Sequence, residues 1–401
     1  MPPAVMWGDV PWTALAATIT TQALATMALY SIPAVAPAIA RDLGIPGEFS
    51  SMVIAAGYGS GVVSALASPD FVHRFGAVRI SQFVMLCTVA MLLAASAGSV
   101  GWLALAPFLL GVGYGANAPA STHILAPRTP RKIFNLVMSV RQIGVPLGGV
   151  LAALILPPLT LAVGWRWALW VELPALVAIV FLIQLRRDEW DADRKPAHQV
   201  NFRSLIQPFR LLREDPRLRN LSIACFCYSG ISLTFVALTT VHLTKHAGLD
   251  LVRAGQMLAA YQLAGTLSRP VWGWMADRLL SPSRVLALHG FGMTAAAIAA
   301  GQIGGTWSQW AVLAVAIAAG VSAGGYTGVA YAEYAHIGGA RRTEATGLGT
   351  AMMFAAVLIL PPIIGGMALV LGDYAIPYFL LAVLALPCAV LMWRQKLAPP
   401  R

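Results

Sequence analysis

An arginine inside an apolar stretch of membrane-spanning length is the residue with the most specific chemistry. Arg141 lies about eight residues into the apolar segment 133–163, roughly 12 Å from its nearer end if the segment is helical. A guanidinium at that depth is costly in lipid unless it has a partner or a ligand. Because it can hold a carboxylate through two parallel hydrogen bonds, we interpret Arg141 as a candidate anion-binding group. The structural alternative is that it pairs with a helix-end carbonyl or extends to the membrane surface.

Two further polar residues are expected at the same level as Arg141, and a third is its neighbour in the chain. Asn117 sits about ten residues, roughly 15 Å, from the same end of its own segment. Gln22 lies at a comparable depth in the first apolar segment, and Gln142 follows Arg141 directly. Polar groups at one depth on different helices are typical of a substrate site near the membrane midplane. The sequence therefore predicts a substrate-binding group of Arg141, Gln142, Asn117 and Gln22.

Two carboxylates also fall inside apolar segments. Glu172 is about one and a half turns from one end of its segment, and Glu333 about one turn from the opposite side of the membrane. A carboxylate out of bulk water suits a group that binds and releases a proton. The alternatives stay open: Glu333 could instead form a gate with Arg278, Arg341 or Arg342, and Glu172 could be a structural residue.

The elements that carry these residues are membrane-spanning helices. Of the 401 residues, 58% are hydrophobic and only 11% charged, with a mean hydropathy of +0.72, whereas a soluble domain has roughly 25% charged residues. A helix needs about 20 apolar residues to cross the hydrocarbon. We therefore predict an all-α polytopic membrane protein with twelve spans, at 12–40, 51–68, 80–98, 102–126, 133–163, 167–185, 221–243, 254–275, 285–304, 310–335, 346–371 and 376–393.

The basic residues predict the orientation of the chain. If both termini are cytoplasmic, 21 of the 27 Lys and Arg residues fall in inner loops and four in outer loops, as the positive-inside rule requires. The net charge of +11 is then explained by contact with anionic lipid, without a nucleic-acid partner. We expect a multi-pass protein of the bacterial inner membrane.

A charged turn occurs twice, half a chain apart. The stretch Gly265–Arg284 contains Asp277 and Arg278, and a shift of 204 positions places Gly265 on Gly61 and Arg278 on Arg74. Each copy lies between the second and third spans of its half, which indicates a duplicated helical bundle. We predict a six-helix bundle over 1–185, a cytoplasmic linker over 186–220 and a second bundle over 221–401. Within the linker, 202–212 is expected to form a short amphipathic helix.

These features resemble the major facilitator superfamily (MFS) of secondary transporters over essentially the whole chain. Gly273-x-x-x-Asp277-Arg278 fits the family signature after the eighth span, and Arg74-Phe75-Gly76 fits its counterpart after the second. His73 stands where the family usually has Asp, with Asp70 one turn earlier. The resemblance implies that spans one, four, seven and ten surround the substrate, so Tyr228 and Tyr326 become candidate lining residues; the alternative is packing.

Two motifs in the fifth span favour different substrates. Ser139-Val-Arg141-Gln142 is similar to bacterial organic-anion and cyanate-type permeases, whereas Gly144-Val-Pro146-Leu-Gly148-Gly149 resembles a Gly-Pro-Gly-Gly element of exporters. Our hypothesis is a secondary active transporter, proton-coupled and working by alternating access, for a small organic anion or related metabolite. A proton-driven drug exporter and a transporter-like sensor are the alternatives. Asp277, Arg278, Arg74, Glu333 and Glu172 are the candidate coupling or gate residues.

Enzyme and metal chemistry have no support in the sequence. There is no P-loop, no Gly-x-Ser-x-Gly elbow and no His or Cys spacing for zinc. The four cysteines all fall within spans, where they are expected to be packing residues. We therefore expect no enzyme activity and no cofactor, and a monomer whose partners are its substrate, protons and the bilayer.

Overall fold

The computed structural model describes residues 10–45, 49–200 and 205–395, and helices account for all regular structure in these ranges. The prediction of an all-α membrane protein is confirmed. Ten stretches of the described residues are long and apolar enough to cross a membrane; one of them, Gln309–Leu371, contains two of the predicted spans. The predicted eighth span is not among the ten, because Gln256, Gln262 and Arg269 lower the hydropathy of its helix, Leu251–Arg278.

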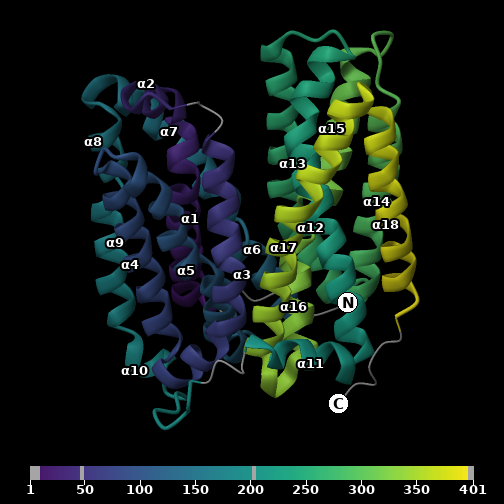
Figure 1. Ribbon diagram of the computed structural model, residues 1–401. Helices are drawn as coiled ribbons and strands as arrows, with labels where there is room; N and C mark the ends of the chain where they lie inside the picture. The colour runs from purple at the N-terminus through teal and green to yellow at the C-terminus, as the bar shows by residue number, and fades with distance from the viewer. Residues whose placement is uncertain (1–9, 46–48, 201–204, 396–401) are drawn as a thin grey trace. The chain divides into compact units, whose positions relative to one another are not determined.

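The first half of the chain folds into helices of very different lengths (Figure 1). The long ones are α1 (Trp12–Ala34), α3 (Phe49–Phe75), α4 (Ala77–Ser96), α5 (Val100–Leu125) and α7 (Gly144–Val163). The shorter ones are α2 (Ala36–Leu43), α6 (Phe134–Arg141), α8 (Trp165–Trp170), α9 (Leu173–Gln184) and α10 (Arg187–Trp190). Two 3-10 turns, Ala126–Arg128 and Arg131–Ile133, lie between α5 and α6.

The second half begins with the short α11 (Gln207–Glu214) and continues in longer helices. They are α12 (Pro216–Lys245), α13 (Leu251–Arg278), α14 (Pro282–Gly301), α15 (Gln309–Ala323), α16 (Thr327–Gly338), α17 (Arg342–Leu371) and α18 (Ala375–Trp393). In the linker, the predicted surface helix 202–212 corresponds to α11. Residues 201–204 lie outside the described residues.

The chain forms two compact units, and each unit takes in a short segment from the opposite half of the sequence. Unit 1 comprises the described residues of Met1–Thr129, Arg141–Leu211 and Gly338–Ala351. Unit 2 comprises those of Pro130–Val140, Leu212–Ile337 and Met352–Arg401. The first turns of α17 therefore pack with unit 1, and nearly all of α6 packs with unit 2. Pro130–Val140 includes the start of the predicted fifth span, and Gly338–Ala351 includes the start of the eleventh.

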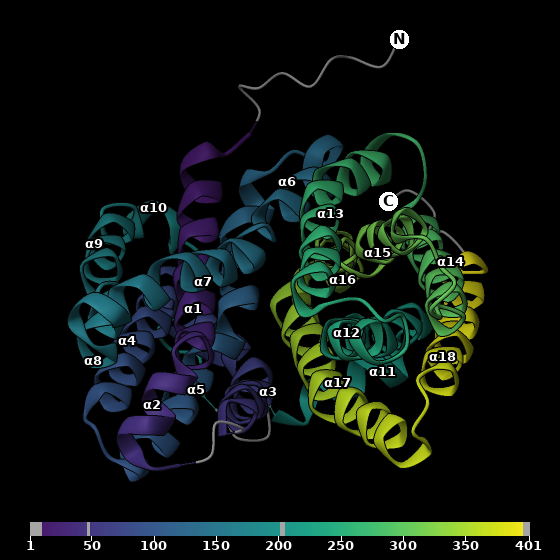
Figure 2. The ribbon, with the colours of Figure 1, turned by 90° about the horizontal axis from the view of Figure 1, so that it is seen from above.

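The internal repeat predicted from the charged turns reappears in the packing of each unit. In unit 1, α3 packs on α5 and α4 on α9; in unit 2 the equivalent spans, α13 on α15 and α14 on α18, pack together (Figure 2). A Cβ added at Gly115 of α5 would lie 2.0 Å from the Gly61 carbonyl oxygen. A Cβ added at Gly265 would likewise lie 3.0 Å from that of Gly320. Gly61 and Gly265, 204 positions apart, thus mark the same helix crossing.

Four of the predicted spans are interrupted helices in the structure. Span one breaks at Val35, between Pro33 and Pro37. Span five breaks after Arg141, span six between Trp170 and Leu173, and span ten between Ala323 and Thr327. Proline and glycine at or near these positions remove the side chain or donor that a regular helix needs. Hydropathy alone does not detect such breaks, because the segments stay apolar on both sides.

Candidate anion-binding site

Arg141 is the centre of a buried polar cluster in unit 1. Its side chain is 1% exposed, the lowest exposure of any charged residue among the described ones. One guanidinium nitrogen, Nη2, donates to Gln22 Oε1 at 2.9 Å and to Ser121 Oγ at 2.9 Å, with a longer bond of 3.4 Å to the Asn117 carbonyl. The other, Nη1, donates to Gln142 Oε1. Hydrogen bonds therefore join Arg141 to Gln22, Gln142 and Asn117, the other members of the predicted substrate-binding group.

Gln22 links the arginine to the fourth span. Its Oε1 also accepts a hydrogen bond from Asn117 Nδ2 at 3.0 Å, while its Nε2 donates to Thr26 Oγ1 at 3.0 Å and to Tyr114 Oη at 3.3 Å. All these side chains are buried. A buried polar network with this many contacts holds its members in fixed positions.

The backbone around Arg141 is shaped by the break in span five. Gln142 and Ile143 form a turn between α6 and α7, so the two helices need not share one axis. The following helix approaches α1 very closely, since a Cβ on Gly148 would lie 2.2 Å from the Ala23 carbonyl oxygen. Only glycine permits that approach. It brings the turn beside Gln22, because a Cβ on Gly144 would lie 2.9 Å from the Gln22 Cβ.

The centre of the cluster is a guanidinium, which stays protonated in proteins. In the four hydrogen bonds described above, the accepting oxygen atoms belong to amides, a hydroxyl and a carbonyl, so these contacts orient the group and are themselves uncharged. In addition, Asn117 Oδ1 is buried without a hydrogen-bond partner among the described residues. Buried polar atoms are normally paired. This arrangement suits an anionic ligand whose carboxylate or similar group meets the arginine and whose hydroxyl meets the amide.

Sequence reasoning missed three members of the cluster: Ser121, Thr26 and Tyr114. Ser121 is one helical turn beyond Asn117 and donates to its carbonyl at 2.6 Å. The four-residue spacing is the signal that would have found it, because residues i and i+4 share a helix face. Thr26 stands in the same relation to Gln22. Tyr114 offers no such signal, since only the packing of α5 on α1 brings it near.

Glu172 is in unit 1 but outside the cluster. Its side chain is buried at the break between α8 and α9, and neither carboxyl oxygen has a hydrogen-bond partner among the described residues. Pro174 occupies the second position of α9, where a proline is tolerated because its missing N–H would be unpaired anyway. Glu172 stands at the N-cap position of α9 but makes no capping hydrogen bond with its side chain.

Tyr228 and Tyr326 belong to unit 2, where their ring centroids lie 5.7 Å apart in an edge-on arrangement. His289 packs beside Tyr326, and its Nδ1 lies 2.6 Å from the Ser322 carbonyl oxygen. All three side chains are at most 2% exposed. Tyr228 Oη and His289 Nε2 have no hydrogen-bond partner among the described residues. This is a second buried polar group, centred on the break between α15 and α16.

Asp277 caps a helix from a distance of 142 positions in the sequence. Its Oδ1 accepts from the backbone N–H of Asn135 at 3.0 Å and from Asn135 Nδ2 at 2.8 Å, and its Oδ2 accepts from the Leu136 N–H at 2.8 Å. These donors form the first turn of α6, where backbone N–H groups lack partners and favour a negative charge. Gly273, one turn earlier, allows the approach: a Cβ there would lie 2.7 Å from Leu136 Cα.

The earlier copy of the turn also contacts the first turn of another helix. His73 Nε2 lies 3.3 Å from Glu344 Oε1, in the first turn of α17. Asp70 instead pairs with His198 at 2.9 Å. The loop residue Asp191 accepts a hydrogen bond from the Val78 N–H at 2.9 Å and so caps α4. Burial raises the pKa of the Asp191 carboxyl above its ordinary value.

Glu333 lines a cavity of about 240 Å³ in unit 2, together with Arg131, Arg217, Asp277 and His336. No arginine of the described residues forms an ion pair with Glu333 within 4.0 Å. Its surroundings are nonetheless basic. The gate partners expected from the sequence, Arg278, Arg341 and Arg342, do not line this cavity.

Metal ligation has no candidate in the described part of the chain. No three His, Cys, Asp or Glu side chains there are arranged to hold a metal ion. The four cysteines are free thiols.

Comparison with known proteins identifies the family. The chain matches the Major Facilitator Superfamily over residues 18–336 and again over residues 236–401, and it therefore belongs to that family. The family resemblance predicted from the signature turns is confirmed. The family and the fold are those of membrane transporters rather than enzymes.

Similar proteins agree with this assignment. The 4-hydroxybenzoate transporter PcaK of Pseudomonas aeruginosa is 27% identical over 291 residues. That alignment covers 63% of this chain and 63% of PcaK, so this chain spans less than two thirds of that relative. The "Probable nitrate/nitrite transporter NarK2" of Mycobacterium tuberculosis is 26% identical over 372 residues, covering 86% of this chain and 87% of NarK2.

A solved structure shows the same fold. The crystal structure of the MFS transporter FucP in the outward conformation superposes with a TM-score of 0.71 at 16% identity, covering 96% of this chain and 99% of FucP. This likeness confirms the twelve-helix MFS fold.

Proposed function

We propose that this protein is a secondary active transporter that carries a small organic anion across the bacterial inner membrane by alternating access. The observation that carries the proposal is the buried guanidinium of Arg141, held by neutral acceptors beside the unpartnered Asn117 Oδ1. A fixed positive charge at that depth has a clear use when the substrate is negative. The cluster supports anion binding, and the family supports transport.

The names of the relatives point to the same chemistry. 4-Hydroxybenzoate carries a carboxylate, and nitrate is also a planar oxyanion. Both shapes match the planar fork of a guanidinium, which forms two parallel hydrogen bonds to such a group; an ammonium does not reproduce this geometry. We therefore assign Arg141 as the principal substrate-binding residue, oriented by Gln22, Gln142 and Asn117. Tyr228 and Tyr326, which belong to unit 2, are proposed as further substrate-binding residues.

The driving force is assigned to protons, with Glu333 as the coupling or gating carboxylate. Two six-helix halves, 1–185 and 221–401, joined by the linker 186–220, would alternate around the site. Both termini are placed in the cytoplasm, following the distribution of basic residues. Asp277, Arg278 and Arg74 in the two signature turns are assigned to the gate, and a monomer is the working unit.

The test is binding and counterflow with the purified protein in liposomes. 4-Hydroxybenzoate and nitrate serve as substrates, in parent protein and in Arg141→Lys and Arg141→Gln variants. Loss of a charge-assisted contact in a buried site should weaken binding by about 2–4 kcal/mol, roughly 30- to 1000-fold. Arg141→Lys should keep part of the affinity and Arg141→Gln almost none.

A matched control separates charge from position. Arg210→Gln removes an exposed arginine from α11 and should leave affinity unchanged. If Arg141→Gln binds and exchanges the anion like the parent, Arg141 is structural and the anion assignment fails. Transport of apolar compounds by Arg141→Gln, with no anion transport by the parent, would instead establish the drug-exporter alternative.

A further inference from the structure

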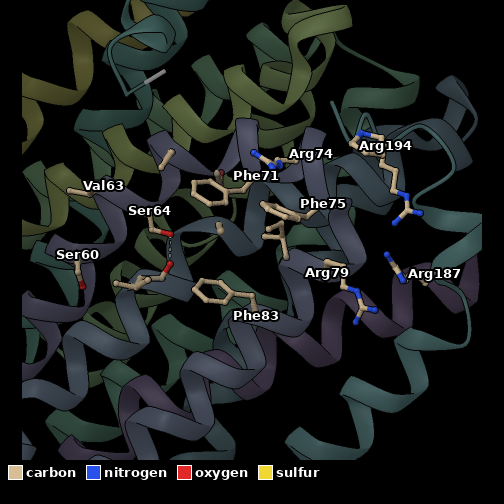
Figure 3. A pocket seen from close by; sticks show the side chains of 16 residues that line it. Ser60, Val63, Ser64, Phe71, Arg74, Phe75, Arg79, Phe83, Arg187 and Arg194 are labelled. Atoms are coloured by element: carbon tan, nitrogen blue, oxygen red, sulfur yellow. Dashed lines mark hydrogen bonds between the residues drawn. The ribbon is translucent and has the colours of Figure 1, made fainter. Parts of the chain in front are cut away.

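An apolar groove runs along the surface of unit 1, and none of the residues that line it belongs to the Arg141 cluster. Its volume is about 990 Å³, and α3, α4 and α5 form its walls. Val63, Phe71, Phe75 and Phe83 line it and are 39–56% exposed (Figure 3). The groove follows α3 from Ser60 to Arg74, which is roughly 21 Å at 1.5 Å per residue. It is thus somewhat longer than one leaflet of hydrocarbon, about 15 Å thick.

The interior of the groove offers little to a polar ligand. Ser60 Oγ donates to the Ala56 carbonyl of its own helix at 2.8 Å. Ser64 Oγ donates to the Val112 carbonyl across the groove, as the dashed line in Figure 3 shows. Ser68, the third serine of the lining, donates to the Ala65 carbonyl at 2.9 Å. All three serine hydroxyl protons are therefore used within the protein.

Four arginines gather at one end of this groove. Arg74 and Arg79 come from the turn between α3 and α4, and Arg187 and Arg194 come from the segment after α9 (Figure 3). None of the four forms an ion pair within 4.0 Å with a carboxylate of the described residues. Arg187 Nε is buried and has no hydrogen-bond partner in the described part of the chain.

Three carboxylates of unit 1 in this region contact other groups. Asp191 caps α4 through the Val78 N–H. Asp193 pairs with His123 at 3.0 Å, and Asp70 pairs with His198. Asp191 also lies within electrostatic range of Arg187 without forming an ion pair within 4.0 Å, so the four arginines leave an excess of positive charge at this end of the groove.

We propose that this groove binds one anionic phospholipid, with its phosphate on Arg74, Arg79, Arg187 and Arg194 and an acyl chain along Val63, Phe71 and Phe83. Arginine holds phosphate through paired charge-assisted hydrogen bonds, and basic pockets on membrane helices bind anionic headgroups. A soluble anion would use only the arginine end, and an apolar compound would use only the groove. A phospholipid uses both.

The bound lipid would join two parts of unit 1. Arg74 and Arg79 lie at the turn between α3 and α4, whereas Arg187 and Arg194 lie about 110 positions later in the chain. The later segment already reaches this turn through the Lys195 N–H, which donates to the His73 carbonyl at 2.7 Å. A phosphate between the two pairs of arginines would strengthen that connection.

The proposal is tested by counting bound lipids on the purified protein with native mass spectrometry. The protein in detergent is titrated with dioleoylphosphatidylglycerol and, separately, with dioleoylphosphatidylcholine. We expect the anionic lipid to bind about tenfold or more tightly than the zwitterionic one. The double variant Arg74→Gln/Arg194→Gln should lower its affinity to that of phosphatidylcholine. Both arginines are exposed, so the variant should fold normally.

Two further variants separate headgroup, chain and general charge. Arg210→Gln/Arg213→Gln removes the same charge from exposed positions on α11 and should bind phosphatidylglycerol like the parent. Ala67→Trp fills the groove and should lose the lipid while keeping all four arginines. Equal binding of the two lipids by the parent, or unchanged affinity in the Arg74/Arg194 variant, would overturn the proposal. So would full displacement of the lipid by millimolar inorganic phosphate, which would make this a phosphate site.

Discussion

At the scale of single residues, hydrogen bonds to Gln22 fix the orientation of the buried Arg141 side chain. The Gln22 amide oxygen accepts from both Arg141 and Asn117. Its amide nitrogen donates to Thr26 and Tyr114, which hold Gln22 in place. The guanidinium therefore has a fixed direction before any ligand arrives. Such preorganisation reduces the entropy lost on binding.

Replacing Gln22 should weaken anion binding without touching the charge. In Gln22→Leu, Arg141 and Asn117 both lose an acceptor, and we expect about a tenfold loss of affinity by calorimetry. The control is Thr18→Val on the same helix, whose hydroxyl donates only to carbonyls of its own helix at 2.9 and 3.0 Å. Affinity in Gln22→Leu equal to that in Thr18→Val would show that Gln22 does not orient the arginine.

Glu333 can be assigned to coupling or to gating by one comparison. If Glu333 carries the proton, Glu333→Gln should abolish uphill transport driven by a pH gradient and spare exchange at equal substrate concentrations. The measurement is liposome uptake with and without the gradient, beside the exposed Glu189→Gln as control. Loss of both activities would indicate a gate, and loss of neither would remove Glu333 from the mechanism.

At the scale of elements, the signature turn works as a cap for a helix that is distant in sequence. Asp277 receives three hydrogen bonds from the start of α6, and Gly273 makes room for that helix. Because α6 runs directly into the turn that follows Arg141, the contact connects the signature turn with the candidate site along one continuous stretch of chain. This gives the Gly-x-x-x-Asp spacing a physical meaning: both residues face the same helix, one turn apart.

Removing the cap should loosen α6 selectively. Loss of an N-cap costs about 0.5–2 kcal/mol, so Asp277→Ala should speed amide hydrogen exchange in peptides covering 134–141 by roughly 2- to 30-fold. Asp250→Ala removes the cap of α13, which accepts from the Arg253 N–H at 3.0 Å, and should affect only the start of that helix. Unchanged exchange in 134–141 for Asp277→Ala would mean that packing alone holds α6.

At the scale of the whole molecule, the distribution of basic residues is the strongest constraint on orientation. With cytoplasmic termini, inner loops hold most of the Lys and Arg residues. The same orientation places the four groove arginines at the inner leaflet, where anionic lipid attracts them.

Single cysteines in a cysteine-free background should report this orientation. Arg194→Cys and Lys245→Cys are both exposed positions, in predicted inner and outer loops respectively. In intact spheroplasts, a membrane-impermeant maleimide should label only Lys245→Cys, and permeabilised cells should show both labels. The reverse labelling pattern would require an inverted topology.

The sequence by itself determined the class of the molecule, the number of its spans and its internal repeat. These depend on local quantities: the length of each apolar stretch, the loops that hold charge, and a spacing of 204 between the turns. Depth along a helix is also local, which is why Arg141, Asn117 and Gln22 could be placed at one level.

Only the tertiary structure decided which groups touch. The turn after Arg141, the contact of Tyr114 with Gln22, and the cap of Asp277 on α6 all join residues that packing brings together. The breaks in four spans also depend on packing. A membrane bundle tolerates a broken helix because neighbouring helices can form hydrogen bonds with the backbone groups that the break leaves unpaired. A single glycine in the sequence does not reveal which helix packs against it. A close helix crossing depends on glycines in both helices, as at Gly115 and Gly61.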